Sequence, residues 1–284
     1  MVETNAKVYL RPSSVEEAWT ILNERGERAK LVGGGADVVL YASSATTTLV
    51  DLDGLPLKTI ERGNDGLVIG SGVTFTELLE SPVVAGYLHG VVTDMLRGVG
   101  SPLLRNLATV GGTLGSAHPW SDVIPLFVSL GAMVTLHNGT TRTVALEDLI
   151  ADRPLLHRCV ITHVRLPIAS PRAAAAFLKF GRTKVDVGLL NCACFAAGRE
   201  DKVETVRITV GGAPAIAQRV PAAEAVVLGN CLDAEVIAQA AAAGAEAVDV
   251  RNDRRASGEY RRTLTAVGIR RCLERIGERW GETA

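Results

Sequence analysis

The sequence predicts an α+β protein of two domains, and three observations lead to that class. The chain has 284 residues, which is long for one small hydrophobic core. Hydrophobic residues make up 47% and charged residues 21%, as in an ordinary globular protein rather than a disordered one. Strand-like runs at 177–180, 187–195 and 205–210 precede an alanine-rich helical region that begins at Ala222, and this order is typical of an α+β domain.

The first half of the chain mixes short strands with helices. Residues 12–27 predict a helix, because Ser13 or Ser14 can cap its start and apolar residues recur at helical spacing. The strongest hairpin signal in the chain is Asn138-Gly139. The other expected elements are strands at 49–52 and 66–70 with a turn at 64–66, a helix opening at 76–79, helices over 83–97 and 122–130, hairpin strands at 133–137 and 141–144, and a strand at 159–166.

In the second half, prolines at 167–171 predict a boundary, beyond which the character of the chain changes. The three strand-like runs that follow are expected to form one antiparallel sheet. Helices are expected over 234–248 and 260–280.

Two glycine clusters are the main functional signal. The first glycine cluster is Gly33 to Asp37, and the second is Thr109 to Thr113. Each follows a short apolar run and is expected where a strand ends. Successive backbone N–H groups in such a loop can form a concave anion site. Two of them suggest a diphosphate held from two sides, as in a dinucleotide cofactor; the alternative for either cluster alone is a tight turn.

The pattern excludes several function classes. There is no G-x-x-x-x-G-K-[ST] motif, and neither cluster reads as G-x-G-x-x-G opening a helix, so neither a P-loop nor a Rossmann site is expected. The net charge is −1 with no basic stretch, which argues against nucleic acid as a partner. The apolar runs are too short to span a bilayer. Residues 1–7 contain no apolar signal-peptide core, so a cytoplasmic location is expected.

The sequence predicts no metal site in this chain. Its five cysteines are scattered, and an odd, sparse set fits a reducing compartment. Cys192 and Cys194 would face the same side of a strand, which we interpret as a buried strand of small residues because no second pair stands at metal spacing. No C-x4-C-x2-C run is present for an iron–sulfur cluster, and the histidines show no ligand spacing.

Over nearly its whole length the chain resembles the FAD-binding medium subunits of molybdenum hydroxylases, the family of carbon monoxide dehydrogenase, xanthine dehydrogenase, aldehyde oxidoreductase and nicotine dehydrogenase. The matching stretches of the first half are Arg11 to Ser14 with Glu17-Ala18, Val32 to Asp37, Gly70 to Thr74, Ser101-Pro102 with Arg105-Asn106, Thr109 to Gly112, and Pro119 to Asp122. Those of the second half are Val210 to Pro214, Arg219 to Pro221 with Glu224, and Ser257 to Arg262.

The resemblance implies a two-lobed FAD-binding domain of the vanillyl-alcohol-oxidase/p-cresol-methylhydroxylase type over residues 1–168, with the lobes split near 55–65. A smaller α+β domain of antiparallel sheet and helices would follow over 172–284. It also implies an electron-transfer subunit that binds FAD. A molybdopterin-binding large subunit would hydroxylate the substrate, and a small subunit would carry [2Fe–2S] clusters. The flavin would pass electrons to an external acceptor such as NAD+, a quinone, a dye or oxygen.

The resemblance assigns no catalytic residue to this chain and implies a set of FAD-binding positions. The first pyrophosphate loop would contain Gly34, Gly35 and Asp37, and the second would contain Thr109 and its neighbours. Asp122 would hold the ribose–adenine side, and Lys179 would lie near the flavin ring. The full set of expected cofactor-binding residues is Val32, Gly33, Gly34, Gly35, Ala36, Asp37, Thr109, Gly111, Gly112, Thr113, Asp122, Leu166 and Lys179.

Two positions depart from the family pattern. The family often has Thr, Ser or Gln in place of Ala36 and Asn in place of Thr113, so FAD binding is expected to be weakened and not abolished. Trp120 is bulkier than usual; it would pack on the adenine or cover the loop.

Structural alternatives accompany these assignments. Asp37 and Asp122 could each cap the helix that follows, and Lys179 could be a solvated edge charge. Residues 260–262 are expected to pack the last helix. Two rival functions remain at this stage: a self-sufficient FAD-dependent oxidase or dehydrogenase, and a structural subunit that has lost its flavin.

Overall fold

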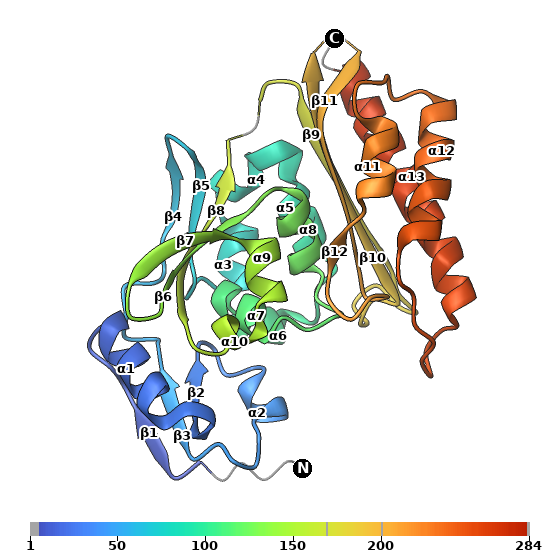
Figure 1. The fold of residues 1–284 in the computed structure, drawn as a ribbon. Helices are drawn as coiled ribbons and strands as arrows, with labels where there is room; N and C mark the ends of the chain where they lie inside the picture. Colours follow the sequence, from blue (N-terminus) through green and yellow to red (C-terminus); the bar gives the residue numbers. More distant parts are fainter. Residues whose placement is uncertain (1–5, 169, 200, 283–284) are drawn as a thin grey trace. The chain divides into compact units, whose positions relative to one another are not determined.

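The computed structural model describes residues 6–168, 170–199 and 201–282. These residues form two compact units (Figure 1). Unit 1 comprises Met1–Val83, Gly100–Ala117 and Met133–Leu166, and unit 2 comprises Val84–Val99, His118–Ala132 and Pro167–Ala284. The sequence predicts a single domain boundary at 168–172. In the structure, Val84–Val99 and His118–Ala132 precede that boundary in the chain but belong to unit 2.

The first sheet of unit 1 is parallel, with strand order β1-β3-β2. Helix α1 (Val15–Arg25) buries Ala18 and Leu22, and the hydroxyl of Ser14 accepts a hydrogen bond from the Glu17 N–H at its start, so the predicted cap and helix are confirmed. The strands are β1 (Val8–Leu10), β2 (Ala29–Val32) and β3 (Thr48–Asp51), with a 3-10 turn η1 (Gly26–Arg28) before β2 and a short helix α2 (Val38–Tyr41) after it.

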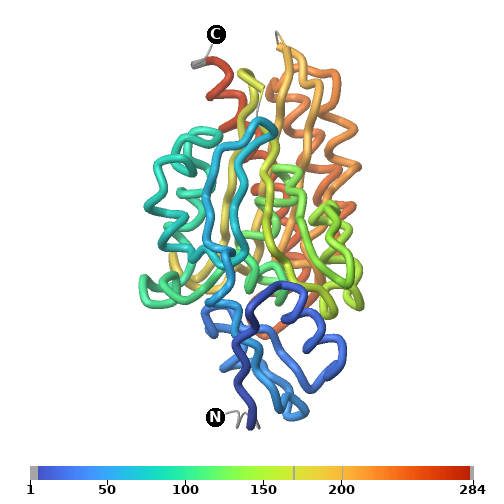
Figure 2. Tube along the Cα trace, turned by 90° about the vertical axis from the view of Figure 1, so that its left-hand side faces the viewer, coloured from blue at the N-terminus to red at the C-terminus, as the bar shows by residue number. Residues whose placement is uncertain are grey.

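The second sheet of unit 1 has the order β4-β5-β8-β6-β7. Its strands are β4 (Ile60–Gly63), β5 (Gly66–Gly70), β6 (Met133–His137), β7 (Thr141–Ala145) and β8 (Val160–Pro167). The antiparallel pair of β4 and β5 is visible as a hairpin in Figure 2. The predicted hairpin around Asn138-Gly139 is confirmed, and Gly139 takes the positive φ of 92° that this turn requires.

Five short helices complete unit 1. Helix α3 begins with a reciprocal capping box between Thr74 and Glu77. Helix α6 was not predicted; Ser101 caps it and a proline occupies its first turn. The helices are α3 (Phe75–Glu80), α6 (Pro102–Leu107), α7 (Val110–Ser116), α9 (Leu146–Ala151) and α10 (Arg153–Leu156).

The single helix predicted over 83–97 is wrong. The segment forms α4 (Pro82–Ala85), the 3-10 turn η2 (Tyr87–Gly90) and α5 (Val91–Leu96). Leu88 and His89 have left-handed backbone conformations, with φ values of 45° and 54°, which no α-helix can accommodate. Apolar composition alone could not reveal that break.

Unit 2 is built on an antiparallel sheet of order β12-β11-β10-β9, as the sequence predicts for its three long strands. The strands are β9 (Ala173–Phe180), β10 (Leu190–Arg199), β11 (Lys202–Gly211) and β12 (Gln218–Arg219). Helices α11 (Pro221–Val227), α12 (Ala234–Ala247) and α13 (Gly258–Glu282) cover one face, and α5 and α8 (Val123–Ser129) lie on the other (Figure 1). Among the described residues, no helix combines the length and apolar character that a membrane crossing requires.

Candidate functional site

The first glycine cluster connects the end of β2 to the start of α2. Gly35 has a φ of 79°, and a Cβ there would meet only a Val32 methyl carbon at 4.0 Å, so backbone conformation and not space requires glycine. The backbone N–H groups of Gly33, Gly34, Gly35 and Ala36 donate to no atom among the described residues. This run of amides at the carboxyl end of a parallel strand has the chemistry of an anion-binding loop.

The second glycine cluster is not a loop at a strand end, so that prediction is wrong. It is the first turn of α7, and Thr109 is its N-cap. The N–H groups of this turn all donate within unit 1: Val110 to the Val73 carbonyl at 2.9 Å, Gly111 to the Ser71 carbonyl at 2.8 Å, Gly112 to the Thr109 hydroxyl at 3.1 Å, and Thr113 to the Thr109 carbonyl at 3.0 Å. The low helix propensity of glycine favours a loop here, but the Thr109 side chain caps the first turn and the segment forms a helix.

The two clusters meet in unit 1. A Cβ on Gly34 would lie 1.6 Å from the carbonyl oxygen of Leu107, and one on Gly33 would lie 2.5 Å from the Thr109 hydroxyl. The hydroxyl of Ser116 donates to Asp37 Oδ2 over 2.8 Å. Asp37 makes no capping bond to α2, so the structure does not support the capping alternative. Because Gly33 and Gly34 have no side chains, the first glycine cluster can lie directly against the start of α7.

The remaining residue assigned to unit 1 is Leu166. It lies in β8 and is fully buried. The structure therefore places it in the core of the second sheet.

Asp122 and Lys179 form a buried ion pair within unit 2. The distance from Lys179 Nζ to Asp122 Oδ2 is 2.9 Å, and the side chains are 9% and 8% exposed. Lys179 also donates to the Gly98 carbonyl, so the alternative of a solvated edge charge is wrong. Asp122 makes no capping bond to α8. Burial raises the pKa of Asp122, and Lys179 opposes that shift.

The sequence analysis missed Asn191. It is fully buried in β10, and its Nδ2 donates to the Ser121 carbonyl over 3.1 Å. Its Oδ1 and Asp122 Oδ1 are both buried without a hydrogen-bond partner among the described residues. Orphaned acceptors of this kind call for a donor such as a ligand hydroxyl. A polar residue inside the apolar run 189–195 was the available signal.

Trp120 stacks on His118, with ring centroids 4.5 Å apart and planes 10° from parallel. Both interpretations of Trp120, adenine contact and loop cover, stay predictions.

Cys192 and Cys194 face the same side of β10 and are fully buried, as predicted. Cys272 of α13 joins them, and the three sulfur atoms lie within 4.8 Å of one another. Sequence spacing could not reveal this third member. The group lies in the apolar core of unit 2, and burial raises the pKa of Cys194 well above its ordinary value. We therefore interpret the three cysteines as part of the packing of this core.

The first glycine cluster, in which the amides of Gly33 to Ala36 lack partners among the described residues, lies beside the threonine-capped α7 and has the chemistry expected of a loop that binds an anion. The model of the FAD binding domain in molybdopterin dehydrogenase matches residues 3–169, and that of the CO dehydrogenase flavoprotein C-terminal domain matches residues 175–276. The chain belongs to the family of FAD-binding medium subunits of molybdenum hydroxylases.

Relatives share this organisation along nearly their whole length. The chain is 30% identical over 279 residues to the nicotine 6-hydroxylase medium subunit of Paenarthrobacter nicotinovorans, covering 95% of this chain and 97% of that protein. It is 25% identical to the carbon monoxide dehydrogenase medium chain of Hydrogenophaga pseudoflava, covering 93% and 95%. The reconstituted CO dehydrogenase from Oligotropha carboxidovorans superimposes with a TM-score of 0.90 at 25% identity, covering 98% and 100%. These matches confirm the fold class and the oxidoreductase assignment.

Proposed function

We propose that this chain is the electron-transfer subunit of a heteromeric molybdenum hydroxylase. In this proposal a small subunit with [2Fe–2S] clusters supplies electrons, and a large subunit with the molybdopterin cofactor oxidises the substrate. The relatives are named as medium subunits or medium chains, which supports an assembly with a small and a large partner. FAD, when bound, can accept electrons singly, as from [2Fe–2S] clusters, and release them singly or in pairs, so NAD+, a quinone, a dye or oxygen could be the acceptor.

The observation that carries the proposal is the run of amides in the first glycine cluster that have no hydrogen-bond partner among the described residues. Four successive N–H groups can donate to a diphosphate without any lysine or arginine. The second glycine cluster contributes differently. Its amides already have partners, so Thr109 and Thr113 would act through side-chain oxygens and through the placement of α7 against the loop.

Unit 2 would contribute two side-chain oxygens that accept hydrogen bonds from hydroxyl groups. Asp122 Oδ1 and Asn191 Oδ1 would accept hydrogen bonds from hydroxyl groups of FAD, because both atoms are buried without a partner in the part of the chain that the structure describes. The resemblance placed Asp122 and Lys179 at different ends of the cofactor, but the direct ion pair joins them. We therefore propose that they act as one feature, in which the charge of Lys179 favours the ionised form of the Asp122 carboxylate.

The state of the chain's cysteines supports a reducing compartment. All five are free thiols, and four of them are buried. We propose that the complex works in the reducing environment of the cytoplasm.

Purification of the tagged chain from its native host, with its partners retained, tests the assembly. We expect flavin absorption bands on top of the broad iron–sulfur absorption, about one FAD per chain, and two further chains by mass spectrometry. Flavin and steady turnover of a small alcohol by the isolated chain would support the self-sufficient oxidase instead. Assembly with both partners but without flavin would support the structural subunit.

The site is tested separately on the isolated full chain. Asp122→Asn should raise the FAD dissociation constant roughly tenfold, because the amide weakens the acceptor and leaves Lys179 unpaired. Asp94→Asn is the matched control, since Asp94 belongs to the same unit but pairs at the surface with Arg97. Equal dissociation constants for the two variants would contradict the role of Asp122.

A further inference from the structure

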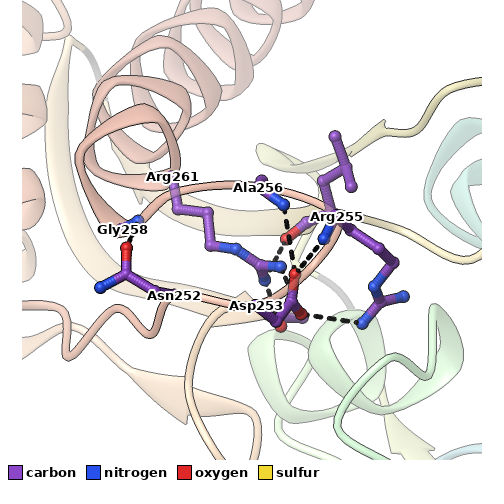
Figure 3. Close-up of polar contacts among 8 residues, drawn as sticks. Asn252, Asp253, Arg255, Ala256, Gly258 and Arg261 are labelled. Atoms are coloured by element: carbon purple, nitrogen blue, oxygen red, sulfur yellow. Dashed lines mark hydrogen bonds and ion pairs between the residues drawn. The ribbon is translucent and has the colours of Figure 1, made fainter.

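The first turn of α13 contains a fully buried arginine that the proposed function leaves unexplained. Arg261 Nη1 donates to the carbonyl oxygens of Leu189 at 2.8 Å and Gly212 at 2.9 Å. Its Nη2 forms an ion pair with Asp253 Oδ2 at 2.7 Å. Figure 3 shows the guanidinium directed at Asp253, which lies in the turn preceding the helix. A charge this deeply buried is costly unless several groups compensate it. These three partners compensate it in part, since Nε has no hydrogen-bond partner among the described residues.

Asp253 is itself held in place. Its Oδ1 accepts hydrogen bonds from the N–H groups of Arg255 at 2.8 Å and Ala256 at 3.2 Å (Figure 3). Asn252 Oδ1 accepts the Gly258 N–H at 2.6 Å at the start of the helix. Although burial opposes ionisation, these N–H groups and Arg261 lower the pKa of Asp253 to about 2. The carboxylate is therefore ionised throughout the physiological pH range.

The two carbonyl groups that Arg261 holds lie beside the segment that leads to Asp122. Leu189 directly precedes β10, where Asn191 donates to the Ser121 carbonyl. Gly212 directly follows β11, and its own N–H donates to the Pro119 carbonyl over 2.8 Å. Gly212, which donates to Pro119, is thus itself bonded to Arg261, and Asn191, which donates to Ser121, lies two residues after Leu189.

Gly212 has little freedom to move. Its φ is 80°, and a Cβ there would lie 3.1 Å from the Leu190 Cα. The start of β10 and the end of β11 are therefore packed backbone to backbone, and the guanidinium joins their carbonyl groups.

We infer that Arg261 is a positioning residue for the cofactor site: through the ends of β10 and β11 it holds residues 119–121, and so the carboxylate of Asp122 and the amide of Asn191, in the arrangement that receives FAD. The inference rests on the proposed role of Asp122. The planar fork of arginine is required because a lysine ammonium cannot align with two carbonyl groups and a carboxylate in the same way.

The test compares Arg261→Lys with Arg262→Lys in the full chain. Arg262 is the matched control because it is the next residue of the same helix, yet it donates to the Ala245 carbonyl of α12. We expect Arg261→Lys to raise the FAD dissociation constant roughly tenfold, measured by flavin fluorescence quenching, and Arg262→Lys to change it less than about twofold. Thermal unfolding of the FAD-free chain records any general loss of stability.

A purely structural role predicts a different result. Arg261→Lys would then lower the unfolding temperature of the FAD-free chain without changing the dissociation constant, and that outcome would overturn the inference. Arg261→Lys combined with Asn191→Ala sharpens the test. If Arg261 acts through Asn191, the double variant should bind FAD about as weakly as Asn191→Ala alone, whereas fully additive losses contradict that route.

Two further variants keep the inference testable. If Arg261→Lys does not fold, Asp253→Asn removes one partner of the guanidinium while keeping both carbonyl contacts, and it should raise the dissociation constant about threefold; an unchanged constant would overturn the inference. Asp122→Asn separates the two claims. If Asp122→Asn leaves FAD binding unchanged, the proposed role of Asp122 fails. If it weakens binding and neither Arg261→Lys nor Asp253→Asn does, only the Arg261 inference fails.

Discussion

The two glycine clusters share a Gly-Gly pair and use it for different physical purposes. In the first, four amides stay without partners among the described residues, and Gly35 takes a left-handed conformation. In the second, every amide of the turn is bonded, and the helix begins at once behind its Thr109 cap. The first glycine cluster offers hydrogen-bond donors, whereas the second lets a helix approach its neighbours closely.

The difference teaches that glycine content alone does not identify a phosphate loop. A Cβ on Gly111 would lie 2.6 Å from the Ser71 Cβ, so this glycine is required by packing. What distinguishes the first cluster is a set of unsatisfied donors, which becomes visible only when the partners of each amide are known.

The largest effect is expected for Gly34→Ala. Its new methyl group would lie 1.6 Å from the Leu107 carbonyl oxygen, a backbone atom that cannot rotate away. The free energy of unfolding should fall by about 3 kcal/mol or more, with loss of FAD binding, in denaturant titrations and flavin fluorescence. Gly54→Ala is the control, because no atom lies within 4 Å of its added Cβ. Similar losses in both variants would show that the clusters do not meet as described.

Gly111→Ala tests the second cluster. The clash with Ser71 should lower the free energy of unfolding by about 2 kcal/mol. The FAD dissociation constant of the folded fraction should change little, because the amides of this turn are already bonded within the protein. Gly115→Ala in the same helix has open space and should stabilise the chain by about 0.5 kcal/mol or more. A large loss of FAD affinity without a loss of stability would assign the second cluster a direct donor role.

Much of the fold could be predicted because local signals agree with the packing. The alternating hairpin around Asn138-Gly139, the capped α1 and the alanine-rich α12 each combine turn or cap chemistry with a clear apolar period. The break at Leu88 and His89 could not be predicted, because no glycine or proline stands at those two positions to mark the left-handed backbone.

The candidate site was predictable only in part. The first glycine cluster follows from composition and spacing, whereas Asn191 and Arg261 depend on contacts across long stretches of chain. Arg261 is bonded to a residue 72 positions earlier in the sequence, and the ion pair of Asp122 with Lys179 spans 57 positions. Residue type alone suggests solvent exposure for both cations, and tertiary structure overrides that expectation.

A hydrogen bond from Ser116 to Asp37 connects the end of α7 to the first glycine cluster, and variants of the two residues test whether that connection matters for FAD binding. Ser116→Ala removes only the bond to Asp37 and should raise the FAD dissociation constant about threefold. Asp37→Ala should raise it roughly tenfold if the carboxylate also contacts the cofactor, which its place in the expected pyrophosphate loop would allow. Equal effects in isothermal titration would restrict Asp37 to holding α7, whereas no effect of Ser116→Ala would show that the connection is dispensable.

The only expected gain in FAD affinity concerns Ala36. Its backbone N–H is among the free amides, but its methyl side chain offers no donor. Ala36→Ser should lower the FAD dissociation constant by about two- to tenfold, because the new hydroxyl can donate one hydrogen bond to a bound diphosphate. Ala45→Ser, at an exposed position of the same unit, controls for a general effect of a new hydroxyl. If Ala36→Ser leaves the affinity unchanged while Gly34→Ala abolishes binding, the first glycine cluster acts through its backbone alone, and its contrast with the second cluster becomes sharper.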